Sequence, residues 1–433
     1  MHLRKCLLRL GLTLLFICGG AGLARAQFVV PGPEMRRAGP VSAVESDAAG
    51  NIYLAGNFDE FNGDRSSGRG LLKLTPTGGK HLKWDMLSID GVSDLLIHGN
   101  FLYVAGSFGN VRTLSAGTIS RPYLLRVFLT GINEGKIDTS WVPAPNASVT
   151  ALETDGTSLF IAGGFTTVNA VNRFRLAKIL ISGGDPDEVD GNWNPAPNNR
   201  VTALEYAAPS LYVSGEVSVL GGVVDSYLGR LSVTGTGAAD ASWKPSVNRP
   251  VTVLESGGGH LYFGGDFTMV EGAARRYLGR YSTAAGAAAI DAIWKPAPDA
   301  EVSRMLHVGS SIYLAGSFSN VAGVPRRYMA KVSVSGTGAA DPSFLPEPNG
   351  SIRDLKWISG QLLAGGGFHT TSGAESSGFA LMDGATGASL AGIAGSVTTA
   401  GTINAMEPVP GGMIIGGQFD SVGGVHRTNI ARI

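Results

Sequence analysis

Residues 251–298 read VTVLESGGGHLYFGGDFTMVEGAARRYLGRYSTAAGAAAIDAIWKPAP. About fifty residues later the same phrases return as VSRML, SSIYLAGSF, VPRRYMAKVS and DPSFLPEP. About fifty residues earlier they stand as VTALE, LYVSGEV, YLGRLSV and SWKPS. Recurrence at a fixed period is the sequence signature of a repeat architecture. The repeat therefore decides the fold, although it does not specify an activity.

Eight copies of the first phrase alternate apolar and polar residues over five positions, which is the period of a β-strand. They begin at Val41, Val92, Val149, Val201, Val251, Val302, Ile352 and Ile403. The second phrase is the most constant, and its copies end at Phe58, Phe108, Phe165, Val217, Phe267, Phe318, Phe368 and Phe419. These ends are spaced by 50, 57, 52, 50, 51, 50 and 51 positions. The small residues inside this phrase predict a close approach of another backbone.

A third strand follows a longer loop, as in LGRY281, and a fourth short strand carries an aromatic residue before a Pro-x-Pro step. The aromatic residues are Trp84, Trp141, Trp193, Trp243, Trp294 and Phe344. One large aromatic per repeat at a fixed register favours core packing over a series of sugar-stacking sites. Four short antiparallel strands per fifty residues are typical of a β-propeller blade.

The repeats predict an all-β fold, a β-propeller of eight four-stranded blades in one domain spanning residues 27–433. A seven-bladed ring with one irregular copy is the alternative, and a linear β-solenoid competes less well because its rungs are usually shorter and its ends need caps. The chain ends at Ile433, directly after a third strand. Residues 27–33, QFVVPGP, are similar to WVPAP at 141–145, so we expect an N-terminal strand to complete the C-terminal blade and close the ring.

The phrases LYFGGDF, GVPRRYMAKVS, SWKPS and VTALE resemble the repeats of the bacterial delta-60 repeat β-propeller family, and kelch repeats more distantly. The resemblance covers residues 41–433 and recurs eight times. It implies a propeller fold and an exported or surface protein. It implies no particular activity, because one fold serves many functions.

Residues 1–26 read as a secretory signal peptide. Arg4 and Lys5 give a positive start, residues 10–18 form a short apolar run, and Ala24-Arg25-Ala26 precedes the expected cleavage before Gln27. The run is too short to span a membrane, which takes about 20 apolar residues. We therefore expect a periplasmic, extracellular or cell-surface protein with no membrane span. Both cysteines, Cys6 and Cys18, would leave with the signal, so no disulfide is expected.

The charge composition argues against nucleic acid as a partner. The chain has 34 basic and 34 acidic residues, whereas a nucleic-acid-binding face needs a basic surplus. At 44% hydrophobic and 16% charged, the chain can bury a large core.

Two sets of charged residues recur in the strands. A glutamate closes the first strand at Glu45, Glu153, Glu205, Glu255 and Glu407, and a cation sits in the third strand at Lys73, Arg126, Lys178, Arg230, Arg280, Lys331 and Arg432. The glutamates could form a cation-binding or water-holding ring at the propeller axis. We favour the other interpretation, that glutamate and cation pair within each blade, since burial of either alone is costly. Leu96, Leu306 and Lys356 also interrupt the ring.

Other chemistry is weakly indicated. His81, His98, His260, His307, His369 and His426 fall at different places in the repeats without metal-ligand spacing, so we expect no metal site. The acidic loop at residues 57–64 lacks the D-x-D-x-D-G ladder of a calcium loop. There is no G-x-S-x-G elbow, and the paired glycines lie in strands rather than before helices, so neither a nucleophile nor a cofactor is expected.

The sequence favours a non-enzymatic scaffold or binding module for a protein, glycan or cell-envelope component, acting as a monomer. The alternative is a hydrolase or lyase acting on a polysaccharide or lactone in the central funnel. The loops after the second strands and before the first strands emerge on one face, and loops carry function more often than strands. We predict an anionic ligand there, bound by Arg173, Arg275, Arg276, Arg326, Arg327 and Arg427.

Overall fold

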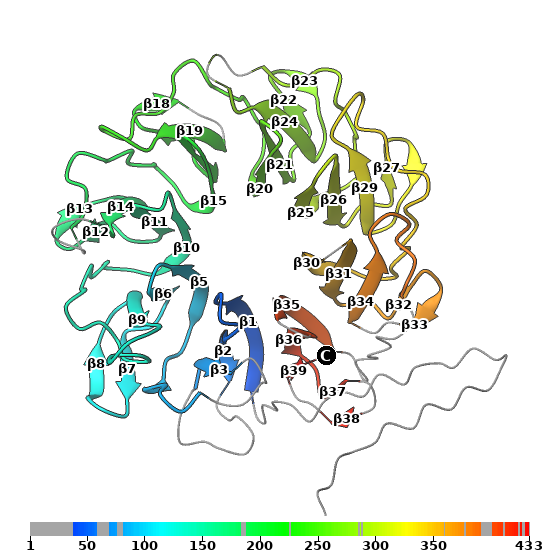
Figure 1. Ribbon diagram of the computed structural model, residues 1–433. Helices are drawn as coiled ribbons and strands as arrows, with labels where there is room; N and C mark the ends of the chain where they lie inside the picture. Colours follow the sequence, from blue (N-terminus) through cyan, green and yellow to red (C-terminus); the bar gives the residue numbers. More distant parts are fainter. Residues whose placement is uncertain are drawn as a thin grey trace, which may run out of the picture.

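The computed structural model describes residues 38–58, 69–75, 81–182, 188–224, 227–284, 286, 289–358, 360–375, 378–390, 401–409, 412–422, 425–426 and 429–432. Regular structure in these residues consists of β-strands, arranged as a ring of small sheets around a central axis (Figure 1). Among the same residues, no helix is long and apolar enough to cross a membrane. The all-β propeller predicted from the repeats is confirmed.

Apart from one sheet at the rim described below, the described residues form eight antiparallel three-stranded sheets, which follow one another around the ring and are each built from one sequence repeat. The strands nearest the axis are β1 (Ala38–Ser46), β5 (Val92–His98), β10 (Val149–Thr154), β15 (Val201–Ala207), β20 (Val251–Gly257), β25 (Val302–Val308), β30 (Ile352–Ile358) and β35 (Thr402–Val409). The middle strands are β2 (Ile52–Phe58), β6 (Phe101–Gly106), β11 (Ser158–Gly163), β16 (Ser210–Gly215), β21 (His260–Gly265), β26 (Ser311–Gly316), β31 (Gln361–Gly366) and β36 (Gly412–Gln418). The outer strands are β3 (Leu71–Leu74), β9 (Leu124–Phe128), β14 (Leu176–Leu180), β19 (Leu228–Ser232), β24 (Leu278–Ser282), β29 (Met329–Ser333), β34 (Phe379–Asp383) and β39 (Ile430–Arg432).

Between the middle and outer strands the chain forms a hairpin at the rim. In six repeats its two strands have two residues each: β12 (Thr167–Val168) and β13 (Val171–Asn172), β17 (Val219–Leu220) and β18 (Val223–Val224), β22 (Met269–Val270) and β23 (Ala273–Ala274), β27 (Asn320–Val321) and β28 (Val324–Pro325), β32 (Thr370–Thr371) and β33 (Ala374–Glu375), and β37 (Ser421–Val422) and β38 (Val425–His426). The second repeat differs. Its hairpin, β7 (Asn110–Thr113) and β8 (Gly117–Ser120), also pairs with β4 (Met86–Ser88).

The paired small residues of the second phrase lie where backbones come close, as predicted. A Cβ on Gly265 would stand 2.4 Å from the carbonyl oxygen of Pro250 and 3.0 Å from the Cα of Val251. A Cβ on Gly264 would meet Val302 of the next sheet at 3.1 Å. The absence of a side chain at Gly264 therefore lets the neighbouring sheet pack closely. The absence of one at Gly265 lets the start of the inner strand of the same sheet pack closely.

The ring closes where the first and last repeats pack together. Ile414 and Ile430 of the last sheet belong to the same buried cluster as Leu54 and Leu72 of the first. Ser46 Oγ on β1 donates a hydrogen bond to Glu407 Oε1 on β35 at 2.6 Å. The predicted closing strand, residues 27–33, lies outside the described residues, so its pairing stays a prediction.

The sheets hold three strands where the sequence predicts four. The fourth segment touches its sheet at single bridges, such as Val127 with Ile137 and Ile179 with Val189. The chain leaves the sheet after that point because an aspartate begins a turn. Asp138 Oδ1, for example, accepts hydrogen bonds from Ser140 N and Ser140 Oγ at 3.0 and 2.6 Å. The turn places the aromatic residue in the core, so the predicted packing role is confirmed: Trp84, Trp141, Trp193, Trp243, Trp294 and Phe344 are all buried.

Candidate functional site

The outer-strand cations do not pair with the inner-strand glutamates. The register shows why: Glu205 lies opposite Tyr212, and Tyr212 lies opposite Arg230, so a whole strand separates the two charges. The cations bind other carboxylates instead, mostly the aspartate that begins the aromatic turn. The pairs are Lys73–Glu134, Arg126–Asp138, Lys178–Asp190, Arg230–Asp240, Arg280–Asp291 and Lys331–Asp341. For these six cations the predicted pairing with the glutamate of the same blade is therefore wrong.

These cations also join neighbouring repeats. Lys178 Nζ donates to Val233 O of the next repeat at 2.8 Å, and Arg230 Nη1 donates to Ala284 O at 3.0 Å. Burial alone would raise the pKa of Asp240, but hydrogen bonds from Ser242 and Arg230 lower that pKa to about 2. The cation, aspartate and aromatic residue form a structural unit at each of these seams between sheets.

The inner-strand carboxylates bond across the seams on the axial side. Glu205 Oε1 accepts hydrogen bonds from Ser256 N and Ser256 Oγ of the next sheet at 3.1 and 2.6 Å. Glu255 Oε1 accepts one from His307 N at 2.8 Å. Asp94 makes the same kind of link with Leu152 N, also at 2.8 Å. Each of these carboxylates thus satisfies a backbone donor of the neighbouring inner strand.

Burial and mutual repulsion shift the pKa of the axial carboxylates upward. Burial raises the pKa of Glu45 to about 7, with the charge of Glu407 adding to the effect. Burial likewise raises the pKa of Glu153 and of Glu255 to about 7, with Glu205 adding to both. Perturbed acids mark catalytic sites, but structural hydrogen-bond networks perturb pKa values too. Glu255 belongs to the second class, because it accepts its hydrogen bond across a seam. Glu153 accepts one from the backbone N–H of its own neighbour, Thr154, at 2.7 Å.

Lys356 takes the place of the inner-strand glutamate in the seventh repeat, next to the contact between the last and first repeats that closes the ring. Its ammonium lies 3.4 Å from Glu407 Oε2, and Glu407 accepts the hydrogen bond from Ser46 on the first repeat. Burial would lower the pKa of Lys356, but the carboxylates of Asp354, Glu407 and Glu45 raise it above its usual value. The charge therefore offsets the crowding of acids at ring closure. In the described part of the chain, no group of three His, Cys, Asp or Glu side chains is arranged to hold a metal ion.

The six predicted ligand-binding arginines divide into two kinds, with one lying outside the described residues. Arg173, Arg275 and Arg326 are buried, and each binds backbone carbonyls of its own aromatic turn. Arg275 Nη1 donates to Trp294 O and Nη2 to Asp291 O, both at 2.7 Å. These bonds hold the aromatic turns in place, which supports a packing role, and anion binding by these three arginines stays a prediction.

Arg276 and Arg327 follow the buried arginines in the chain and are exposed. A ligand-binding role for them stays a prediction. Arg427 is outside the described residues, and so is most of the acidic loop at 57–64.

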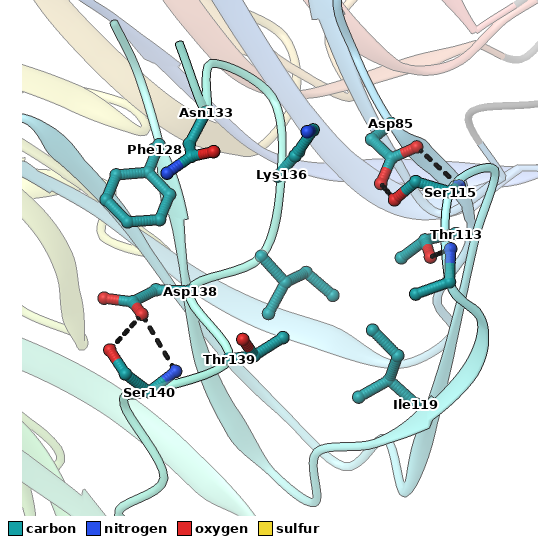
Figure 2. Close-up of a pocket in the computed structure, with 12 residues that line it drawn as sticks. Asp85, Thr113, Ser115, Ile119, Phe128, Asn133, Lys136, Asp138, Thr139 and Ser140 are labelled. Atoms are coloured by element: carbon teal, nitrogen blue, oxygen red, sulfur yellow. Dashed lines mark hydrogen bonds between the residues drawn. The ribbon is translucent and has the colours of Figure 1, made fainter. Parts of the chain in front are cut away.

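The second repeat holds a pocket of about 350 Å³ (Figure 2). Thr113, Ser115 and Ile119 of the long hairpin form one wall. The opposite wall comes from Phe128 at the end of β9 and from Lys136 in the turn that follows. The volume lies within the usual range for small-ligand pockets, about 300–1,000 Å³. Most of the lining residues are polar, with Ile119, Phe128 and Ile137 as the large apolar ones.

Polar contacts hold the walls of the pocket in place. Asp85 Oδ1 and Oδ2 accept hydrogen bonds from Ser115 N at 2.9 Å and from Ser115 Oγ at 2.5 Å, which fixes the hairpin tip (Figure 2). Asp85 N donates to Gly135 O at 3.1 Å, which ties the same segment to the opposite turn. Asp138, in the pocket floor, is neutralised by Arg126 at 2.7 Å. Lys136 is exposed and supplies the ammonium group of the lining.

The sequence interpretation missed this pocket, although a signal for it was present. The spacing between Phe108 and Phe165 is 57 residues, against 50 to 52 elsewhere. Most of the extra length falls between the second and third strands, where the long hairpin forms. A departure from the repeat length marks an insertion, and insertions in repeat proteins map to loops that often carry binding.

No protein-family model matches the chain, and no curated protein sequence is significantly similar to it. Solved structures of similar fold include Sqt1 from Saccharomyces cerevisiae, at 12% identity over 89% of this chain and 95% of that one, with a TM-score of 0.51. The computationally designed Ika8 protein covers 93% of this chain and all of its own at 12% identity (TM-score 0.48). The WD40 β-propeller domain of Doa1 is 10% identical, covering 81% and 95% (TM-score 0.44). At these identities the likeness concerns the fold alone.

Proposed function

We propose that the protein is an exported, non-enzymatic binding module whose binding surface is the pocket and long hairpin of the second repeat. The observation that carries the proposal is the placement of this pocket at the repeat with the most divergent length. Elsewhere, the recurring charged residues are largely engaged in joining one sheet to the next. A propeller in which one repeat differs from the others suits a ligand-binding role, because the similar repeats hold the loops of the different one in fixed positions.

The engagement of the axial carboxylates disfavours the alternative, a hydrolase or lyase in the central funnel. Acid–base catalysis requires a carboxyl group that can reach a substrate proton. Glu205, Glu255 and Asp94 instead accept hydrogen bonds from backbone donors across the seams. Displacing those bonds would leave buried N–H groups without partners, at about 1–3 kcal/mol each.

Export rests on the first 26 residues, which carry the positive start, apolar run and small-residue cleavage pattern of a signal peptide. The envelope or the cell exterior is therefore where we place the ligand, as a glycan, a protein or another envelope component. Determining the N-terminus of the secreted protein by mass spectrometry tests this part. We expect Gln27 as the first residue.

Binding is tested with fluorescently labelled protein spanning residues 27–433, offered to purified bacterial cell-envelope fragments and to immobilised glycans. Ala116 is exposed and lines the pocket, so Ala116→Trp fills it without disturbing the core. The matched control is Ala273→Trp, at an exposed alanine in the short hairpin of the fifth repeat.

We expect Ala116→Trp to weaken binding at least about tenfold, equivalent to about 1.4 kcal/mol, and the control to leave it unchanged. Equal binding by both variants would reject the pocket as the site. Turnover of a polysaccharide or lactone by the purified protein would reject the non-enzymatic assignment.

A further inference from the structure

We propose that the open edge of β8 takes up an extended segment of a partner protein as a fourth strand, and that this segment alternates acidic and apolar residues. The inference rests on the proposed function and deepens it by naming the partner's chemistry. It is carried by three features of the second repeat, namely an unpaired strand edge, a charge of one sign, and exposed apolar side chains beside the pocket.

On the outer edge of β8, backbone donors have no partner among the described residues. In the described part of the chain β8 pairs with β7 alone, in the order β4-β7-β8. Arg121 N donates to Gly109 O at 3.1 Å, and the register continues through Val111 opposite Ile119. Bonded and non-bonded pairs alternate in an antiparallel ladder. The N–H groups of Thr118 and Ser120 therefore point outward, away from β7.

The edge has fewer of the devices that usually prevent strand addition than the other described rim hairpins, although β8 itself is only four residues long. Exposed edges are normally blunted by lysine, proline, a bulge or shortness. β8 reads GTIS, contains neither lysine nor proline, and pairs with β7 without a break in register. The other rim hairpins have strands of two residues, and β28 contains Pro325. Arg121 Nη1 does occupy Ser120 O at 2.9 Å, so one outward carbonyl already has a partner.

Charge selects an acidic segment. Residues 110–121 contain Arg112 and Arg121 and no acidic residue. Arg112 is exposed and lies opposite Thr118, on the outer face of the hairpin. Every second side chain of an added strand would lie on that face. Carboxylates there would complement the arginine, and charge-assisted bonds of this kind are stronger than neutral ones.

The alternate side chains would lie on the pocket side, where apolar and polar side chains are mixed. Ile119, on the inner face of β8, lines the pocket with Phe128. Leu114 at the hairpin tip is 63% exposed, and Ile132, in the turn opposite, is 96% exposed. Both are chain neighbours of pocket-lining residues, Ser115 and Asn133, so they offer apolar contacts at the two sides of the pocket. Strand addition uses both components, since backbone bonds give affinity and alternate side-chain pockets give specificity.

The test uses synthetic peptides as probes. A fluorescent, end-capped EVELET peptide is titrated into the protein spanning residues 27–433. The controls are its KVKLKT counterpart and an EVELET peptide N-methylated at alternate backbone nitrogens. Thr118→Pro removes one outward donor while the inward bonds of Ile119 remain, and Arg112→Glu reverses the charge.

We expect saturable binding of EVELET, weakened at least about tenfold by N-methylation, by Thr118→Pro and by Arg112→Glu. KVKLKT should bind the Arg112→Glu variant better than the parent. N-methylation alters the probe only, so its result stands even if a variant fails to fold.

Equal affinity for the N-methylated and parent peptides would overturn the strand-addition proposal. Sedimentation adds a second arm, because a dimer of the parent that Thr118→Pro dissociates would show a second copy on the edge and overturn it also. If EVELET does not bind while Ala116→Trp still abolishes envelope binding, the strand proposal fails and the proposed function stands.

Discussion

The second and fifth repeats share one frame and differ at one hairpin. In the fifth, Arg275 binds two carbonyls of the aromatic turn, and a hairpin with strands of two residues sits above it. In the second, Arg121 Nη2 makes the corresponding bond to Thr139 O at 2.8 Å, but the hairpin has strands of four residues and encloses a pocket. The difference teaches that the contacts between sheets are kept the same from repeat to repeat, whereas the rim hairpin can lengthen and form a pocket without disturbing them.

The largest expected effect is on a seam. Trp243 is buried between Tyr212 and Tyr281, with ring centroids 5.3 and 5.2 Å away. Trp243→Ala should lower the free energy of unfolding by about 3–5 kcal/mol, the usual result of truncating a buried large aromatic. Denaturant titration measures this change. Peptide binding per folded molecule should be unchanged. A loss of binding without a loss of stability would show that Trp243 serves binding and not packing between sheets.

A second, smaller effect separates two adjacent arginines. Arg275→Leu leaves two buried carbonyls without their charged donor and should cost about 1.5–3 kcal/mol for each bond that is not replaced. Arg276→Leu, at the exposed neighbour, should stay within about 0.5 kcal/mol. Thermal denaturation of the two variants checks this directly. Equal melting temperatures would mean that the buried guanidinium is replaced by water.

The smallest expected effect is a dependence of the free energy of unfolding on pH, in one window above about pH 4.5 and one below about pH 4. Glu45, Glu153 and Glu255 have pKa values raised to about 7, so the folded state binds more protons than the unfolded state between about pH 4.5 and 7. Stability should therefore fall as pH rises through that window. Asp240 and Asp341 have pKa values lowered to about 2, so the stability they contribute is lost as pH falls from about 4 to 2.

The melting temperature should therefore be highest near about pH 4 to 4.5, between the two windows. In Glu255→Gln the melting temperature should fall less steeply between about pH 4.5 and 7, because glutamine cannot ionise but still accepts a hydrogen bond. If the melting temperature of that variant falls as steeply as that of the parent, ionisation of Glu255 does not contribute to the pH dependence.

The repeat pattern predicted the ring, its inner and middle strands and the packing role of the aromatics, because these depend on period and burial. It did not predict that the fourth segment would leave the sheet, since the aspartate turn competes with strand pairing through local side-chain bonds. It also mispaired Glu205 with Arg230, because composition gives charges without the register that places a tyrosine between them. The repeat pattern did not predict the pocket, because the pocket depends on the longer hairpin of one copy and not on the positions that the copies share.

The bond from Ser46 to Glu407 joins residues 361 positions apart in the chain. The ribosome synthesises the chain from the N-terminus at about 5–20 residues per second. The last repeat, which packs against the first, is therefore made roughly 20–70 s after it. During that interval the apolar flank of β2 and β3 has no partner from the last repeat. The earliest-made part of the molecule is thus the last to be completed, which makes it the segment most in need of a holdase before assembly ends.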